Sequence, residues 1–124
     1  MLDAEPQVIH TAASFGLTSW LRNSLDGFDE HGLQGRKNIN KALILAAKYG
    51  HLKNVQVLLA KGAHVNDRGG NYGNVLQAAS AQGHEKVVEM LLVNGADVNA
   101  QGGYYGNALQ AASATGYEKV VEML

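Results

Sequence analysis

Residues 69–91 read GGNYGNVLQAASAQGHEKVVEML, and residues 102–124 read GGYYGNALQAASATGYEKVVEML. The two blocks lie 33 positions apart and differ at four of their 23 positions. The differing pairs are Asn71/Tyr104, Val75/Ala108, Gln82/Thr115 and His84/Tyr117. Self-similarity at a fixed period is the signature of a stacked repeat protein, in which each unit contacts only its neighbours. The duplication therefore predicts a repeat fold and favours a binding role over catalysis.

Two more divergent copies precede these blocks. The first lies 33 residues upstream and shares the apolar and glycine positions, for example Leu43, Gly50 and Leu58 for Leu76, Gly83 and Leu91. The second lies a further 34 residues upstream, where Ile9 and Gly16 correspond to Leu43 and Gly50. One residue is therefore inserted between the two copies. The polar, glycine-containing stretch at residues 26–38 is predicted to be a longer loop that holds the insertion.

Each unit predicts a pair of antiparallel helices. In the third unit, Asn74 is a good N-cap for a short, alanine-rich helix over residues 75–82, and Gly83 ends that helix. An apolar stripe follows on a second helix, and Gly95 is placed as a C-terminal glycine with positive φ. The stripe consists of Val87, Val88, Leu91 and Leu92, with Glu85, Lys86 and Glu89 on the wet side. Neither helix can bury its apolar side chains alone, so the helix pairs are expected to stack on one another.

The strings GHEKVVEMLL (residues 83–92) and GADVN (residues 95–99) resemble the ankyrin repeat. The resemblance covers four units, at about 3–36, 37–69, 70–102 and 103–124, the last truncated. It implies a single all-α solenoid whose helix-turn-helix pairs are joined by β-hairpin-like loops. The usual threonine-proline-leucine-histidine becomes NVLQ (74–77), NALQ (107–110) and NKALI (40–44), and His10 alone keeps the histidine. The glycine-rich form looks like the arrays that follow NACHT-type domains in fungal immune-like receptors.

Composition limits the function classes. The 124 residues are 46% hydrophobic and 17% charged, with net charge −1, which gives no global attraction to nucleic acid or anionic lipid. There is no cysteine, so an intracellular, cytoplasmic location is expected. The first six residues lack the basic and apolar regions of a signal peptide, and no apolar run has the length of a membrane span.

Four patterns that could carry chemistry are better explained structurally. The glycine-rich strings at 68–73 and 101–106 lack the lysine and hydroxyl residue of a phosphate loop, and tight turns account for them. His51 and His84 lie one unit apart, about 10 Å, which is too far for a shared metal ion and suits an inter-repeat or helix-start hydrogen bond. Ser80 and Ser113 occupy a slot that Ala47 fills in the second unit, so they are packing residues. The paired glutamates of the second helices form a solvated face. We expect no enzyme activity, no cofactor and no metal.

The resemblance also places a binding surface. Ankyrin repeats usually meet protein partners on a concave surface made of hairpin tips and first-helix faces. The outward first-helix slots include Lys48/Tyr49, Ala81/Gln82 and Ala114/Thr115, and the hairpin slots of the second unit are Lys37, Asn38 and Asn40. Aromatic residues and arginine in such slots dominate interface energies. The candidate partner-binding residues are Phe15, Lys37, Asn38, Lys48, Tyr49, Arg68, Asn71, Gln82, Gln101 and Tyr104.

Three functions remain open at this point. The first is a non-catalytic protein-interaction module, the sensor or scaffold part of a larger intracellular protein. The second is a structural spacer that self-associates, because the stripe of Val120, Val121 and Leu124 has no following unit to cover it and is expected to fray or to pair with another copy. The third is a nucleic-acid or nucleotide binder that uses Lys37, Lys48 and Arg68, against which the balanced charge argues.

Overall fold

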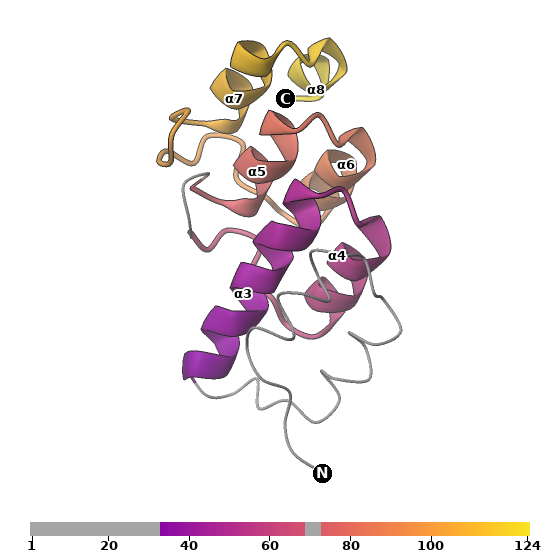
Figure 1. Cartoon of the computed structure of the whole chain (residues 1–124), viewed down its shortest axis with the longest axis vertical. Helices are drawn as coiled ribbons and strands as arrows, with labels where there is room; N and C mark the ends of the chain where they lie inside the picture. Colours follow the sequence, from indigo (N-terminus) through magenta and orange to yellow (C-terminus); the bar gives the residue numbers. More distant parts are fainter. Residues whose placement is uncertain (1–32, 69–72) are drawn as a thin grey trace.

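The computed structural model describes residues 33–68 and 73–124, and these form an all-helical array in two layers (Figure 1). One layer holds the first helix of each pair: α3 (Leu33–Lys48), α5 (Val75–Ala81) and α7 (Ala108–Thr115). The other holds the second helices: α4 (Leu52–Ala60), α6 (Glu85–Val93) and α8 (Glu118–Met123). Helix α5 packs between α3 and α7, and α6 packs between α4 and α8. The predicted solenoid of helix pairs is confirmed.

The short first helices begin where the sequence predicts. Asn74 has extended backbone angles, and its side chain accepts a hydrogen bond of 2.9 Å from the backbone N–H of Gln77. The Gln77 side chain accepts a bond of 2.8 Å from the Asn74 N–H in return, which completes a capping box. The Asn107 side chain caps α7 by accepting from the Gln110 N–H at 2.8 Å. The predicted N-cap Asn74 is confirmed, and its counterpart Asn107 caps the first helix of the fourth unit.

The core runs between the two layers along the array. Val87, Val88 and Leu91 of α6 are buried, as the apolar stripe predicts, while Glu85, Lys86 and Glu89 are exposed. Leu43, Leu58 and Leu76 belong to the same apolar cluster. Gly95 has φ +89°, in the left-handed region that allows the chain to leave the helix at low cost only with glycine. The predicted helix end is therefore confirmed.

The start of the second unit differs from the prediction. The loop expected at 26–38 and the hairpin expected around Lys37, Asn38 and Asn40 are wrong for the described residues, because α3 is continuous from Leu33. The stretch from residue 36 to 48 has no glycine and lacks the GGxYG pattern of the later units. Its buried side chains repeat at helical spacing, so continuing the helix extends the apolar stripe. These side chains are Ile39, Ala42, Leu43, Ala46 and Ala47.

The later units are joined by the predicted hairpin-like loops. Antiparallel bridges pair Arg68 with Asn74 and Gly102 with Gly106. Shifted by the 33-residue period, the pair Arg68/Asn74 corresponds to residues 101 and 107. This pair directly flanks the observed bridge between Gly102 and Gly106 in the same antiparallel register. The two hairpins therefore share one register, and in the fourth unit only residues 103–105 lie beyond the bridge.

Candidate partner-binding surface

The hairpin of the fourth unit is held against α5 by one buried side-chain amide. Gln77 is 2% exposed, and its Nε2 donates to the carbonyl oxygens of Gly102 and Gly106 at 3.0 Å each, with a longer contact of 3.5 Å to that of Ala100. The same side chain closes the capping box of α5. A buried amide whose polar atoms all have partners favours one arrangement of its surroundings. The loop above α5 is therefore fixed in position by the helix below it.

Three of the predicted binding residues lie on or beside this loop, and we call Arg68, Gln101 and Tyr104 the hairpin group. Tyr104 is 82% exposed, and its ring meets that of Tyr105 edge-on at 5.0 Å between centroids. The Gln101 side chain donates to the carbonyl of Asn99 at 3.2 Å. A Cβ built on Gly102 would lie 3.8 Å from Nη1 of Arg68, so the Arg68 side chain reaches the hairpin of the next unit. Gln101 and Tyr104 thus belong to one hairpin, and the Arg68 side chain reaches it at Gly102.

Three others lie where first helices end, and we call Lys48, Tyr49 and Gln82 the helix-end group. Tyr49 follows α3 and is 49% exposed. The Lys48 ammonium lies 5.3 Å from the Tyr49 ring centroid, and the His51 ring stacks on Tyr49 at 6.4 Å. Gln82 is exposed at the C-terminal cap of α5. The helix-end group offers a cationic and aromatic surface.

The two groups lie at opposite ends of the first helices. The hairpins lead into the N-termini of the first helices, whereas the helix-end group lies at their C-termini. A helix of the length of α5 separates the two ends by about 10 Å. All the residues of α5 are buried, Ala81 included. The prediction that Ala81 faces outward is wrong, because α3 and α7 pack on both sides of α5. Among the described residues of the third unit, the exposed predicted contact of the first helix is therefore Gln82 alone, beyond its end.

The remaining predicted site residues are placed as follows. Phe15 and Asn71 lie outside the described residues. Lys37 and Asn38 lie on α3, in its first two turns, rather than on a hairpin. The structure therefore does not place them with the hairpin group of the later units.

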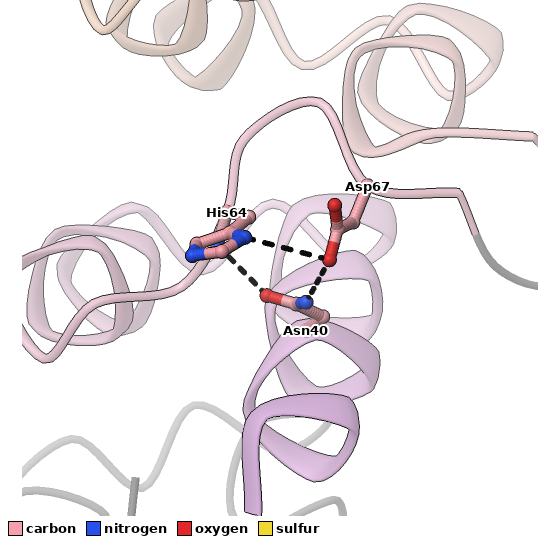
Figure 2. A network of polar contacts seen from close by, with 3 residues as sticks. All are labelled: Asn40, His64 and Asp67. Atoms are coloured by element: carbon pink, nitrogen blue, oxygen red, sulfur yellow. Dashed lines mark hydrogen bonds and ion pairs between the residues drawn. The ribbon is translucent and has the colours of Figure 1, made fainter. Parts of the chain in front are cut away.

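A second polar network ties the turn after α4 to α3 (Figure 2). Asn40 is nearly buried; its side-chain oxygen accepts from the backbone N–H of His64 at 2.8 Å, and its amide donates to the Asp67 carboxylate. The His64 Nδ1 lies 3.7 Å from the same carboxylate oxygen. Asn40 thus holds the turn that leads directly into Arg68, and it supports the hairpin group from below.

His84 and Ser80 contribute to the packing of the repeat units and not to a chemical site. The Nε2 of His84 lies 2.8 Å from the carbonyl oxygen of Lys48, and since a carbonyl only accepts, Nε2 is the donor. This bond joins the third unit to the second, as the inter-repeat interpretation predicts. Ser80 is fully buried in α5, consistent with a packing residue, whereas Ser113 is exposed on α7 and the same prediction is wrong for it. Within the part of the chain that the structure describes, no three histidine, aspartate or glutamate side chains gather as metal ligands would.

Fold and surface define the class of this protein as a helical-repeat solenoid in which the hairpin of the fourth unit is hydrogen-bonded to the first helix of the third. A family model described as ankyrin repeats, in three copies, matches residues 9–102. The chain belongs to the ankyrin-repeat family, whose members are typically protein-interaction modules and are generally non-catalytic. A search of curated proteins finds no match. In the described ranges, no helix has the length and apolar character needed to cross a bilayer.

Sequence reasoning overlooked the residues that position this surface. From the sequence, Gln77 is marked only as a departure from the family's usual motif, and Asn40 only as such a departure and as a hairpin slot. Asn66 was not singled out, although its side chain donates to the Gly95 carbonyl at 3.1 Å and accepts from the Asp97 N–H at 2.7 Å, which links successive turns. A usable signal existed, because glutamine recurs at 77 and 110, and a polar residue repeated on an apolar helix face needs a partner.

Proposed function

We propose that this chain is a protein-interaction module whose partner contacts the hairpin group and the helix-end group together. The single observation that carries the proposal is the Gln77 amide, which holds an exposed tyrosine hairpin rigidly against a buried helix. A loop already ordered before binding loses less conformational entropy on association. The partner is a protein that presents acceptors to Arg68 and Lys48 and apolar surface to the two tyrosines.

Residue types support this choice of contacts. Tyrosine and arginine are enriched at the energetic centres of interfaces, and Tyr49, Tyr104 and Arg68 are all exposed. The two groups are separated by about the length of α5. A partner that spans them covers a broad, preformed surface and needs no pocket, which suits protein rather than small-molecule recognition. We further propose a cytoplasmic setting within a larger, scaffold-type protein, in keeping with a chain free of cysteine.

Affinity capture with quantitative mass spectrometry tests the proposal. The chain is used as bait in cells of its source in three forms: wild type, Tyr49→Ala/Tyr104→Ala, and a control with Glu89→Ala/Glu122→Ala on the opposite, second-helix face. We expect one protein to be captured by wild type and control and lost, by tenfold or more, with the tyrosine variant, since hot-spot truncations cost about 2 kcal/mol or more each. Equal capture by all three forms contradicts the placement of the surface.

A self-associating spacer is the second candidate function. It is supported by the end of the array, where Leu109 is 42% exposed although its counterpart Leu76 is fully buried. Light scattering after size exclusion, across a hundredfold range of concentration, separates the two candidates. A mass that rises with concentration and falls back with Leu109→Ser favours the spacer, and a constant monomer mass opposes it.

A further inference from the structure

Asn94 and Gly95 form the single Asn-Gly pair of the sequence, and both residues are exposed at the end of α6. In such a pair the backbone nitrogen of glycine can attack the side-chain carbonyl carbon of asparagine, because glycine has no Cβ to obstruct the approach. The corresponding pair of the second unit is Lys61-Gly62, which offers no such carbonyl. The third unit therefore carries an intramolecular reaction that the second unit cannot undergo.

This reaction converts the asparagine amide into a carboxyl group. The Gly95 nitrogen bonds to Cγ of Asn94 while the Cγ–Nδ2 bond breaks, and Nδ2 leaves as ammonia with the proton of the Gly95 N–H. The product is a five-membered imide ring. Water then opens the ring, giving aspartate when it enters at Cγ and β-linked isoaspartate when it enters at the backbone carbonyl carbon. Solvent water is the co-reactant, and no electrons are gained or lost.

The folded chain holds the reacting atoms apart. Asn94 has ψ 13°, which turns the Gly95 nitrogen away from the Asn94 Cβ, whereas the imide ring needs these two atoms on the same side of the Cα–C bond. The attacking N–H of Gly95 donates to the carbonyl of Leu92 at 3.1 Å. The leaving Nδ2 of Asn94 donates to the carbonyl of Met90 at 2.8 Å. The reaction therefore requires that this helix end first open.

A side chain of the second unit restrains the same helix end. Asn66 donates to the Gly95 carbonyl at 3.1 Å and accepts from the Asp97 N–H at 2.7 Å. Rotation about ψ of Asn94 moves Gly95 and the residues after it, so closing the imide ring disturbs both bonds. The rate in the folded chain therefore depends on how often the contacts of Asn66 open, because only the open form reacts.

We propose that Asn94 is a site of spontaneous deamidation whose rate is set by opening of the α6 end that Asn66 restrains. The products weaken the same junction. A carboxylate at position 94 cannot donate to the Met90 carbonyl, and it adds negative charge where the helix dipole is already negative. The β-linked product also inserts a backbone atom before Gly95, which displaces the carbonyl that Asn66 binds. Asn94 lies outside the hairpin and helix-end groups, so the reaction does not depend on the partner surface.

Peptide mapping by mass spectrometry tests the site. The whole chain is held at neutral pH, folded in buffer or unfolded in guanidinium chloride, and aspartate and isoaspartate are counted at each asparagine over time. In the unfolded chain Asn94 is expected to convert faster than every other asparagine. In the folded chain its conversion is expected to be about tenfold slower or more, because the helix end must open first. Equal rates at Asn94 in the two states, or faster conversion of another asparagine in the unfolded chain, overturn the proposal.

Asn66→Ala tests the restraint. It is expected to speed conversion of Asn94 in the folded chain about threefold or more, through the loss of two hydrogen bonds, and to leave the rate in guanidinium chloride unchanged. Exchange of the Gly95 amide hydrogen is expected to rise by the same factor. Asn66→Asp, which loses the donor to Gly95 and keeps the acceptor, is a milder variant with the same expectation. An unchanged Asn94 rate in these variants overturns the proposal, whether or not the exchange rises.

Asn99→Ala is the matched control for the restraint. Asn99 is the counterpart of Asn66 in the third unit, whereas the bonds to Gly95 and Asp97 come from Asn66. The control is therefore expected to leave the Asn94 rate unchanged. Acceleration equal to that of Asn66→Ala would contradict the specific role of Asn66.

Asn94→Asp and Asn94→Lys test the consequence of the reaction. Lysine stands at the corresponding position of the second unit, so Asn94→Lys removes the reaction and keeps a residue that suits such a helix end. Asn94→Asp installs the carboxylate and is expected to raise the unfolding constant about threefold relative to Asn94→Lys, measured by urea denaturation. Equal unfolding constants of the two variants would refute the claim that the product weakens the junction.

Discussion

At the scale of single residues, three side-chain amides, of which Gln77 and Asn40 are buried, tie together segments of this protein that are distant in sequence. Gln77 is part of the helix cap of α5 and at the same time an anchor for the hairpin of the next unit. Asn40 connects α3 with the turn after α4, and Asn66 connects successive turns. Each uses both an acceptor and a donor on one planar group, so one side chain makes at least two hydrogen bonds at once.

Ser80 is the residue whose replacement is expected to stabilise the chain. Its hydroxyl is buried in α5 and, alone among the buried side-chain polar atoms of the described residues, has no hydrogen-bond partner. Burying an unpaired hydroxyl costs about 1 kcal/mol or more, and Ala47 fills the same slot in the second unit. Ser80→Ala should therefore raise Tm by a few degrees in a circular-dichroism melt.

Ser113→Ala is the matched control for this experiment. Ser113 is the exposed counterpart on α7, where its hydroxyl is open to solvent, so its replacement is expected to leave Tm within about 1 °C, since surface changes of this kind are small. A loss of stability with Ser80→Ala would mean that the hydroxyl has a partner that the structure does not hold, such as an ordered water.

At the scale of elements, the continuity of α3 is the feature that separates the second unit from the later ones. If the hairpin expected through Asn40 had formed and Asn40 capped the helix, Lys41 would be the first helical residue, where proline is tolerated. In the structure Lys41 lies in the helix interior, where proline removes a backbone bond and costs about 3 kcal/mol. Lys41→Pro is therefore expected to lower the urea midpoint strongly, while Lys41→Ala on this exposed position changes it little.

An unchanged midpoint with Lys41→Pro would show that α3 begins near residue 40 in solution. The far-ultraviolet circular dichroism of the same two variants gives an independent reading. A helix broken at Lys41 loses ellipticity relative to the alanine control.

The junctions between helix pairs depend on a glycine beneath a ring. Gly83 and Gly116 both have positive φ, +72° and +82°, so alanine strains the backbone at either by about 1–2 kcal/mol. Only at Gly83 would the new methyl group also displace the Tyr117 ring, at an added cost of about 1–3 kcal/mol. Gly83→Ala is expected to be the more damaging of the two in chemical denaturation, and equal losses would contradict the role of Tyr117 in the junction.

At the scale of the whole molecule, each unit contacts only its neighbours, so stability should vary along the array. Helix α5 is buried over its full length between α3 and α7, whereas α8 contacts α6 and α7 and ends the chain. Native-state hydrogen exchange should therefore find the slowest amides in α5 and the fastest helical amides in α8. Uniform protection across the helices would instead mean that the array opens as one cooperative unit.

Much of this architecture follows from the sequence alone. The 33-residue period, the capping asparagines, the terminal glycines and the stripe on α6 are local or periodic signals, and each is read from residues within one unit. The hairpin and helix-end residues of the candidate surface were also predicted from the sequence. They occupy positions at which the residue type changes from unit to unit while the framework residues repeat, and a comparison of the units identifies such positions.

Only the tertiary structure decided where a helix begins and which side chains are buried, because both depend on the neighbouring units. Helix α3 runs through the expected hairpin, where Ile39 is buried in the core, and Ala81 is buried in a helix that packs between α3 and α7. Gln77 and Gln110 stand in the same local sequence, yet one is buried with its bonds made and the other is exposed. Sequence determined the unit, since a unit is built from local geometry. Stacking determined burial, since burial depends on which unit lies next to it.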